Sequence, residues 1–426
     1  MNWQHGTTRS GWHVIDGQRL LAVELPRLFG ILNDPASWPV SPPQRLIKLE
    51  HDTLLGYSFE NLSRADLRVV QLKPGVVALQ VHHENLHTDA DLAWAQDYWG
   101  KVVEAAANRL LSEPVLAATA FGKLNLFFRV GPLQDNGYHQ VASLYQSVTL
   151  AETVIAEPIY DPSGDWSVTT GGSVSQAHLA SVPTDSRNLV VKAAKAVAKA
   201  AKVRKPLKLE FFVDKHVPVA GGMGGGSADA AAALVVANRF YGDKLDHDAL
   251  VGLAAELGAD VPFALSGGAA IGVGTGHELQ PIKQVSELHW VLVTDELGLS
   301  TPAVYAELDR LRAQAGKDPS KIRPATVHTS LVTALRKGAP AEEVAQWLHN
   351  DLQEAAVSLR PDLQRLLDLA EPAGALTALV SGSGPTVAYL ARNAQDALAI
   401  QSRLTTFGVA HAMVTTSPAG PAKLLD

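Results

Sequence analysis

The segment 218–227 has the composition of an anion-binding loop, because it reads Pro-Val-Ala-Gly-Gly-Met-Gly-Gly-Gly-Ser. Five glycines in six positions add backbone entropy that folding must remove, so packing does not account for them. The alanine-rich residues that follow, 228–234, predict a helix that begins at about Ser227. Free N–H groups and the positive end of the helix dipole would converge at that helix start. The segment therefore predicts a loop that holds the phosphates of a nucleotide.

Two common kinds of nucleotide loop do not fit this spacing. A P-loop ends in Gly-Lys-Ser/Thr, whereas here Ser227 follows Gly226 with no lysine between them. A dinucleotide-binding loop follows the first strand of its domain and is followed by an acidic residue that binds the ribose. The segment 218–227 comes late in its predicted domain, and no acidic residue is placed for that role. A purely structural glycine turn is the alternative to a phosphate loop.

Polar residues also interrupt an apolar strand predicted over 117–130. Lys123 and Asn125 lie in its middle, and a buried lysine needs a partner to be tolerated. A second glycine turn, 381–385, reads Ser-Gly-Ser-Gly-Pro and lies between two predicted strands. The chain thus carries three separate segments whose residue types suit a polar ligand.

The composition limits the class of protein that these segments can serve. The chain has 426 residues, of which 46% are hydrophobic and 19% charged, which is ordinary for a soluble globular protein of two or three domains. The absence of cysteine excludes disulfides, thiol nucleophiles and Cys-ligated metals. A net charge of −7 argues against nucleic-acid binding. With neither a long apolar run nor a signal-peptide pattern, we expect a cytoplasmic protein that does not bind membranes.

Residues 1–113 differ in composition from the rest of the chain and contain five of its eight tryptophans. Strands are predicted over 53–59, 66–72 and 76–83, followed by a long helix over 89–111. Strands followed by one long terminal helix resemble a START-like, helix-grip domain. Three histidines, at 82, 83 and 87, are interpreted as surface or strand-end residues rather than as metal ligands, and we predict no metal site in the protein.

Three motifs in fixed order resemble the GHMP kinases. They are Lys123-x-Asn125, the segment 218–227 and the turn 381–385. Within that superfamily, further motifs at 121–127, 135–139, 185–190, 258–263 and 350–353 are similar to the 4-diphosphocytidyl-2-C-methyl-D-erythritol kinase family. The resemblance covers about residues 116–426. It implies an α+β, two-domain GHMP kinase fold with an ATP-binding domain at 114–286 and a C-terminal domain at 287–426, preceded by an extra helix-grip-like α+β domain at 1–113.

The resemblance also implies an activity and a set of site residues. The activity is the ATP-dependent phosphorylation of the 2-hydroxyl of 4-diphosphocytidyl-2-C-methyl-D-erythritol in the non-mevalonate (MEP) route to isoprenoids, with Mg²⁺ expected. Asp260 would take or orient the hydroxyl proton, and Lys123 beside it would stabilise developing charge. Such a pair would also give the buried lysine its partner, whereas Asp260 taken alone is a plausible cap or turn residue.

The remaining residues fall into two sets by the ligand that the resemblance implies. For ATP they are Pro218, Val219, Ala220, Gly221, Gly222, Met223, Gly224, Gly225, Gly226, Ser227, Ala228, Asn188 and Lys215. For the cytidine substrate they are Asn125, Tyr138, His139, Thr301, Tyr305, Ser383 and Gly384. Ala228 departs from the family pattern, in which a second serine is common, but Ser227 is expected still to cap the helix.

Other functions stay open at this point. One is a GHMP kinase of the homoserine or mevalonate type, against which Gly137-Tyr138-His139 argues. Another is a non-catalytic nucleotide-binding regulator with residues 1–113 as its sensor. We expect a monomer or a homodimer, and we expect residues 1–113 to be an independent module that catalysis does not need.

Overall fold

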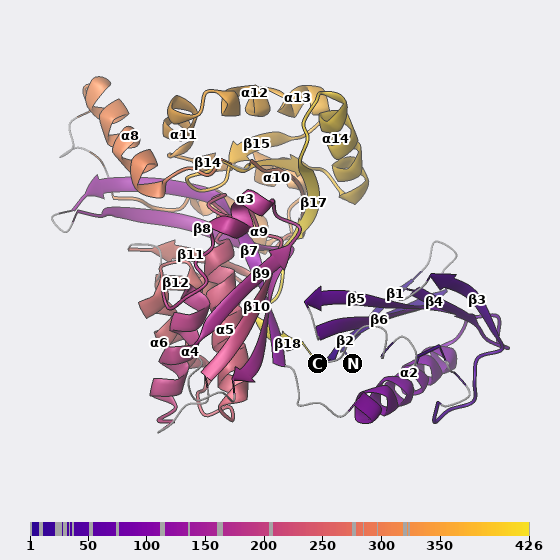
Figure 1. Cartoon of the computed structure of the whole chain (residues 1–426). Helices are drawn as coiled ribbons and strands as arrows, with labels where there is room; N and C mark the ends of the chain where they lie inside the picture. Colours follow the sequence, from indigo (N-terminus) through magenta and orange to yellow (C-terminus); the bar gives the residue numbers. More distant parts are fainter. Residues whose placement is uncertain are drawn as a thin grey trace. The chain divides into compact units, whose positions relative to one another are not determined.

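The fold is that of a computed structural model, which describes residues 2–7, 12–21, 28, 32–33, 35, 38–50, 54–73, 76–110, 116–134, 137–159, 165–203, 208–274, 278–283, 285–295, 297–317, 322 and 324–425. Contacts divide the chain into two units (Figure 1). The first comprises Met1–Ala117 with Ile155–Glu157 and Leu424–Asp426, and the second comprises Ala118–Val154 and Pro158–Lys423. Both units combine helices with strands, so the predicted α+β class is confirmed.

The domain limits predicted from the sequence stay predictions. The limit between residues 113 and 114 lies outside the described residues. The limit between 286 and 287 falls inside the second unit.

The first unit is an antiparallel sheet with one long helix. Its strand order is β1-β2-β6-β5-β4-β3. The bounds are β1 (Asn2–Thr7), β2 (His13–Leu21), β3 (Arg45–Glu50), β4 (Leu54–Ser58), β5 (Arg64–Lys73), β6 (Val76–Leu86) and α2 (Asp89–Leu110). Three of these strands and the helix match the predicted segments. The sequence did not indicate β1, β2 and β3, because glycine, polar or charged residues interrupt their apolar pattern.

Helix α2 buries an aromatic cluster in the first unit. Trp99 is fully buried, and its ring packs edge-on against those of Trp38 and Phe59. Its indole N–H donates to Nδ1 of buried His83, at 2.9 Å. His83 is therefore a core residue rather than a surface one, whereas His82 is exposed and pairs with Asp16. The START-like resemblance of this unit stays a prediction.

The second unit contains two sheets. In the larger one the order is β12-β11-β8-β10-β9, and β7 pairs with both β8 and β14. The smaller sheet is antiparallel, in the order β15-β16-β13-β17. The bounds are β7 (Leu116–Leu133), β8 (His139–Ile159), β9 (Ser167–Gly172), β10 (Lys208–Lys215), β11 (Ala269–Val273), β12 (Glu278–Pro281), β13 (Leu288–Val293), β14 (His349–Asn350), β15 (Thr377–Val380), β16 (Val387–Ala391) and β17 (Ala412–Ser417), with β18 (Lys423–Leu425) near the end of the chain.

Helices cover both sheets. Helices α4, α5, α6 and α7 contact one another beside the larger sheet, and α14 packs on three strands of the smaller one (Figure 1). The bounds are α3 (Gln176–Ser181), α4 (Leu189–Ala200), α5 (Gly225–Phe240), α6 (His247–Leu257), α7 (Val261–Ser266), α8 (Thr301–Gln314), α9 (Thr329–Arg336), α10 (Ala341–Ala345), α11 (Gln353–Leu359), α12 (Asp362–Asp368), α13 (Ala370–Ala373) and α14 (Ala394–Thr406). Among the described helices, none combines the length and apolar character that a membrane crossing needs.

Candidate active site

The glycine loop joins β10 to α5 in the second unit. Gly222 and Gly224 have left-handed backbones, with φ of 77° and 72°. A Cβ atom at Gly222 would overlap the carbonyl oxygen of Ser381, so this position requires glycine. Helix α5 begins at Gly225 with Gly224 as its N-cap, two residues before the predicted start. The expectation that Ser227 caps the helix is therefore wrong, because the left-handed turn at Gly224 brings the chain into the helix earlier.

Lys123 on β7 lies beneath this loop and close to Asp260. Its Nζ is 3.8 Å from Oδ2 of Asp260, and it donates hydrogen bonds to Oδ1 of Asn125 (2.6 Å) and to the carbonyl oxygen of Gly222 (2.8 Å). Burial lowers the pKa of Lys123, and the charge of Asp260 opposes that effect. The buried lysine thus has the partner that the sequence requires.

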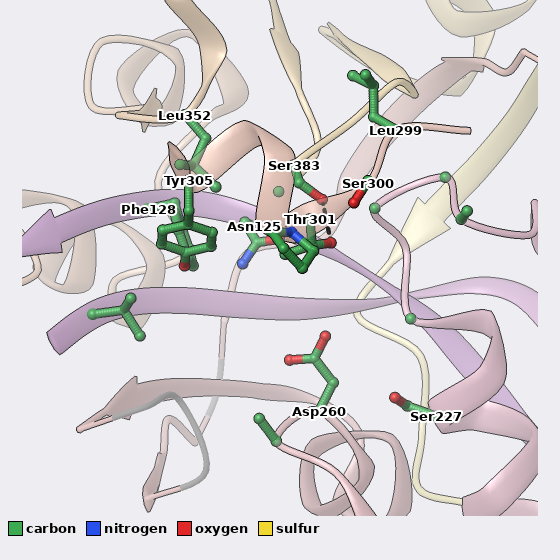
Figure 2. Close-up of a pocket in the computed structure, with 18 of the residues that line it drawn as sticks. Asn125, Phe128, Ser227, Asp260, Leu299, Ser300, Thr301, Tyr305, Leu352 and Ser383 are labelled. Atoms are coloured by element: carbon green, nitrogen blue, oxygen red, sulfur yellow. Dashed lines mark hydrogen bonds between the residues drawn. The ribbon is translucent and has the colours of Figure 1, made fainter. Parts of the chain in front are cut away.

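Asp260 precedes α7 but does not cap it. It occupies the N-cap position, yet its side chain makes no capping hydrogen bond. The carboxylate is 31% exposed and points into a cavity (Figure 2). It is therefore available to a ligand, unlike a carboxylate that is used to close a helix end.

The cavity has a volume of about 1390 Å³, and all of its lining residues belong to the second unit. Three groups of predicted residues line it: the loop, the Lys123–Asp260 pair and most of the predicted cytidine site. Of the predicted residues, those that line it are Lys123, Asn125, Tyr138, His139, Pro218, Ala220, Gly221, Gly222, Gly224, Gly225, Gly226, Ser227, Asp260, Thr301, Tyr305 and Ser383.

Aromatic and polar side chains form the part of the cavity away from the loop. The imidazole of His139 stacks on Tyr305, with ring centroids 5.2 Å apart, and its Nε2 is 3.0 Å from Oδ1 of Asp309. Tyr138 is 67% exposed. Burial and the charge of Asp260 raise the pKa of Tyr305. The residues Asp135 and Asn136 of the same motif lie outside the described residues.

Hydroxyl and amide groups face the same space from other elements. The hydroxyls of Thr301 and Ser383 are 2.9 Å apart and come from α8 and from the turn before β16 (Figure 2). Asn125 donates to the hydroxyl of Ser143 at 2.7 Å. Together these groups present donors and acceptors suited to a polyhydroxylated ligand.

Some predicted residues do not reach the cavity. Lys215 is 2% exposed, and its Nζ is bonded to Glu152 (3.0 Å) and Asp229 (2.7 Å). Asn188 caps α4 by accepting from Val190 N, and the cavity is lined by its neighbour Leu189 instead. Val219, Met223, Ala228 and Gly384 support the loop and the turn without lining the cavity.

Among the lining residues that the sequence did not predict, two have titratable side chains, Asp309 and Tyr145. Asp309 lies four residues after Tyr305 and eight after Thr301, so helical spacing places it on the same face of α8. Tyr145 lies six residues after His139 on β8, where strand alternation returns the side chain to the same face. Periodicity counted from the predicted residues would have found both. The described residues contain no cluster of acidic and histidine side chains that could hold a metal.

Comparisons with known proteins agree with this arrangement. The family models for the GHMP kinase N-terminal and C-terminal domains match residues 188–268 and 331–410. A crystal structure of 4-(cytidine 5'-diphospho)-2C-methyl-D-erythritol kinase superposes with a TM-score of 0.56 and 27% identity, covering 71% of this chain and all of that one. A homoserine kinase from Cytophaga hutchinsonii, with a TM-score of 0.54 and 18% identity, covers 74% of this chain and 98% of its own and shows the fold alone. The fold and the cavity therefore define a GHMP kinase.

Relatives found by sequence show to which family of GHMP kinases the chain belongs. Curated proteins named 4-diphosphocytidyl-2-C-methyl-D-erythritol kinase are 48% identical in Leifsonia xyli, over 72% of this chain and 97% of the relative, and 45% identical in Nocardia farcinica, over 74% and 98%. The chain belongs to the 4-diphosphocytidyl-2-C-methyl-D-erythritol kinase family. The family resemblance predicted from the sequence is confirmed.

Proposed function

We propose that this protein transfers the γ-phosphoryl group of ATP to the 2-hydroxyl of 4-diphosphocytidyl-2-C-methyl-D-erythritol, releasing ADP. The names of its relatives support this substrate and a role in MEP isoprenoid biosynthesis. The observation that carries the proposal is the Lys123–Asp260 pair, which opens into the same cavity as the glycine loop. Phosphoryl transfer needs positioning and charge stabilisation more than covalent chemistry, and this pair with the loop supplies both.

The loop is the proposed site of the ATP phosphates. Helix α5 is 16 residues long, and its first N–H groups have no helical acceptor and lie at the positive end of its dipole. Glycine at 224–226 lets phosphate oxygens approach the backbone closely. The Lys123 ammonium, 2.8 Å from the loop carbonyl of Gly222, would stabilise charge on the transferring group.

Asp260 is the proposed proton acceptor for the substrate hydroxyl. Its carboxylate makes no capping bond and is partly exposed in the cavity, so a hydroxyl can approach it. Asn125, Thr301 and Ser383 are proposed to bind the methylerythritol part, while Tyr138, His139 and Tyr305 are proposed to bind cytosine. The two parts of the substrate would then extend from the phosphates toward the mouth of the cavity.

Magnesium fits this site as a companion of ATP. Mg²⁺ in kinases is held by substrate phosphates together with one or two protein oxygens, and the hydroxyl of Ser227 provides such an oxygen beside the loop. When bound, the ion would neutralise phosphate charge. A cytoplasmic location, a monomeric or homodimeric state and a dispensable N-terminal module stay predictions from the sequence.

The test is an ADP-release assay with three alcohols: the cytidylyl substrate, homoserine and mevalonate. We expect turnover with the first alone. Asp260→Asn should lower kcat by about 10²- to 10⁴-fold while leaving ATP binding in place. Turnover on homoserine without turnover on the cytidylyl substrate would overturn the assignment, and an unchanged rate in Asp260→Asn would remove the carboxylate from the mechanism.

A further inference from the structure

Helix α8 holds the imidazole of His139 from two directions. Tyr305 stacks on the ring at an interplanar angle of 29°. Asp309, one turn later on α8, places Oδ1 3.0 Å from Nε2. His139 is 8% exposed. The stack therefore fixes the plane of the ring, and the carboxylate fixes its rotation within that plane.

The carboxylate also determines which ring nitrogen carries the proton. An ionised carboxylate only accepts hydrogen bonds, so the Nε2 that faces Asp309 must be the donor. In a neutral imidazole the other nitrogen, Nδ1, is then an acceptor. No described residue hydrogen-bonds Nδ1, and His139 lines the cavity. With Nε2 bonded to Asp309, Nδ1 is the ring nitrogen of His139 that is left to accept a hydrogen bond from a ligand in the cavity.

We propose that Asp309 is a specificity-determining positioning residue, which fixes the His139 tautomer so that Nδ1 accepts a hydrogen bond from the amino group of a cytosine. This inference rests on the proposed function. Cytosine and uracil have nearly the same shape but differ at C4, where cytosine bears an amino donor and uracil a carbonyl acceptor. An acceptor on the protein pairs with the first and faces the lone pairs of the second.

The expected selectivity follows from the cost of an unpaired buried acceptor. That cost corresponds to about 10- to 100-fold in kcat/KM between cytidine and uridine substrates. Asparagine at 309 could either accept from Nε2 or donate to it, so both tautomers become available. Asp309→Asn should therefore lower the cytidine-to-uridine ratio by about 10-fold or more, mainly through KM. Asp248→Asn, an exposed change on α6, is the matched control and should leave the ratio unchanged.

Two further measurements separate the tautomer from other roles of Asp309. In the free protein, ¹⁵N NMR should show an unprotonated Nδ1 and a protonated Nε2 for His139, and a mixture in Asp309→Asn. In a His139→Ala background, Asp309→Asn should no longer change the cytidine-to-uridine ratio. A protonated Nδ1 in the parent protein, a ratio that changes less than about threefold, or an effect that persists without His139 would overturn the proposal. Because the NMR result needs no substrate, failure of the tautomer and failure of the proposed kinase activity are distinguishable.

Discussion

Replacing Lys215 with methionine would remove the cation from a buried charge cluster under the glycine loop. Its Nζ bonds Glu152 on β8 and Asp229 on α5, and these three side chains are between 0% and 7% exposed. Glu152 also accepts from the backbone N–H groups of His216 (3.0 Å) and Val217 (3.2 Å). The cluster therefore joins two strands to the first turns of α5, and Lys215→Met leaves two carboxylates buried without their counter-ion.

The expected loss is about 3–5 kcal/mol, the usual cost of removing one partner from a buried ion pair. Burial lowers the pKa of Lys215, but Asp229 and Glu152 outweigh that effect and raise it. The lysine therefore contributes its full stability below its unfolded pKa of about 10.5 and loses it only in strong base. Burial raises the pKa of both carboxylates. Acid protonates these carboxylates in the variant, so the loss of unfolding free energy caused by Lys215→Met should be smaller at pH 5 than at pH 8.

Amide hydrogen exchange of α5 peptides across a urea series measures the unfolding free energy of this element directly. Lys192→Met, an exposed change on α4, is the matched control and should change that free energy by no more than about 0.5 kcal/mol. A deficit below about 1 kcal/mol for Lys215→Met, or one that is equal at both pH values, would refute the reasoning.

Three other changes test separate features. Gly222→Ala should abolish turnover, because its Cβ would overlap the carbonyl oxygen of Ser381 at a left-handed position; near-normal ADP release would show that the loop can relax. Ser227→Ala should change the thermal midpoint little, since Gly224 is the cap of α5; a loss of about 1 kcal/mol would instead indicate a capping hydroxyl. Burial lowers the pKa of His83 to about 3, so its contribution to stability is complete above pH about 6.5 and is lost as the pH falls toward 3. His83→Gln should therefore make the stability of the first unit depend less on pH between about 6.5 and 3, as followed by tryptophan fluorescence. An unchanged pH dependence of unfolding in this range would contradict the prediction.

The parts of the site that could be predicted are those whose residue types are unusual for the element in which they occur. Glycines before an alanine-rich helix and a lysine inside an apolar strand have few structural explanations, so 218–227 and Lys123 were recognisable. Lys215 looked similar, but its carboxylate partners lie 63 and 14 residues away, and nothing local in the sequence shows that they enclose it. Lys215 does not line the cavity, and its role beside the nucleotide stays a prediction.

Helix limits and pairings depend on backbone states that residue types only suggest. Five glycines allow several helix starts, and the left-handed turn at Gly224 selects one. The pairing of His139 with Asp309 spans 170 residues, so it depends on how α8 meets β8 and not on either motif. The helical periodicity of α8 could have identified Asp309 as a cavity residue, but its pairing with His139 could be found only from the tertiary structure.

The carbonyl oxygen of Gly222 has a consequence for how the enzyme would respond to its ligands. It accepts from the Lys123 ammonium and, at 3.2 Å, from the hydroxyl of Ser381, so one acceptor is shared by β7, the loop and the turn before β16. A nucleotide that shifts the loop must alter both bonds together. The affinity for ATP and the reactivity toward the substrate hydroxyl would thereby be linked through this one carbonyl oxygen. Substitutions of Lys123 should therefore change the KM for ATP as well as kcat.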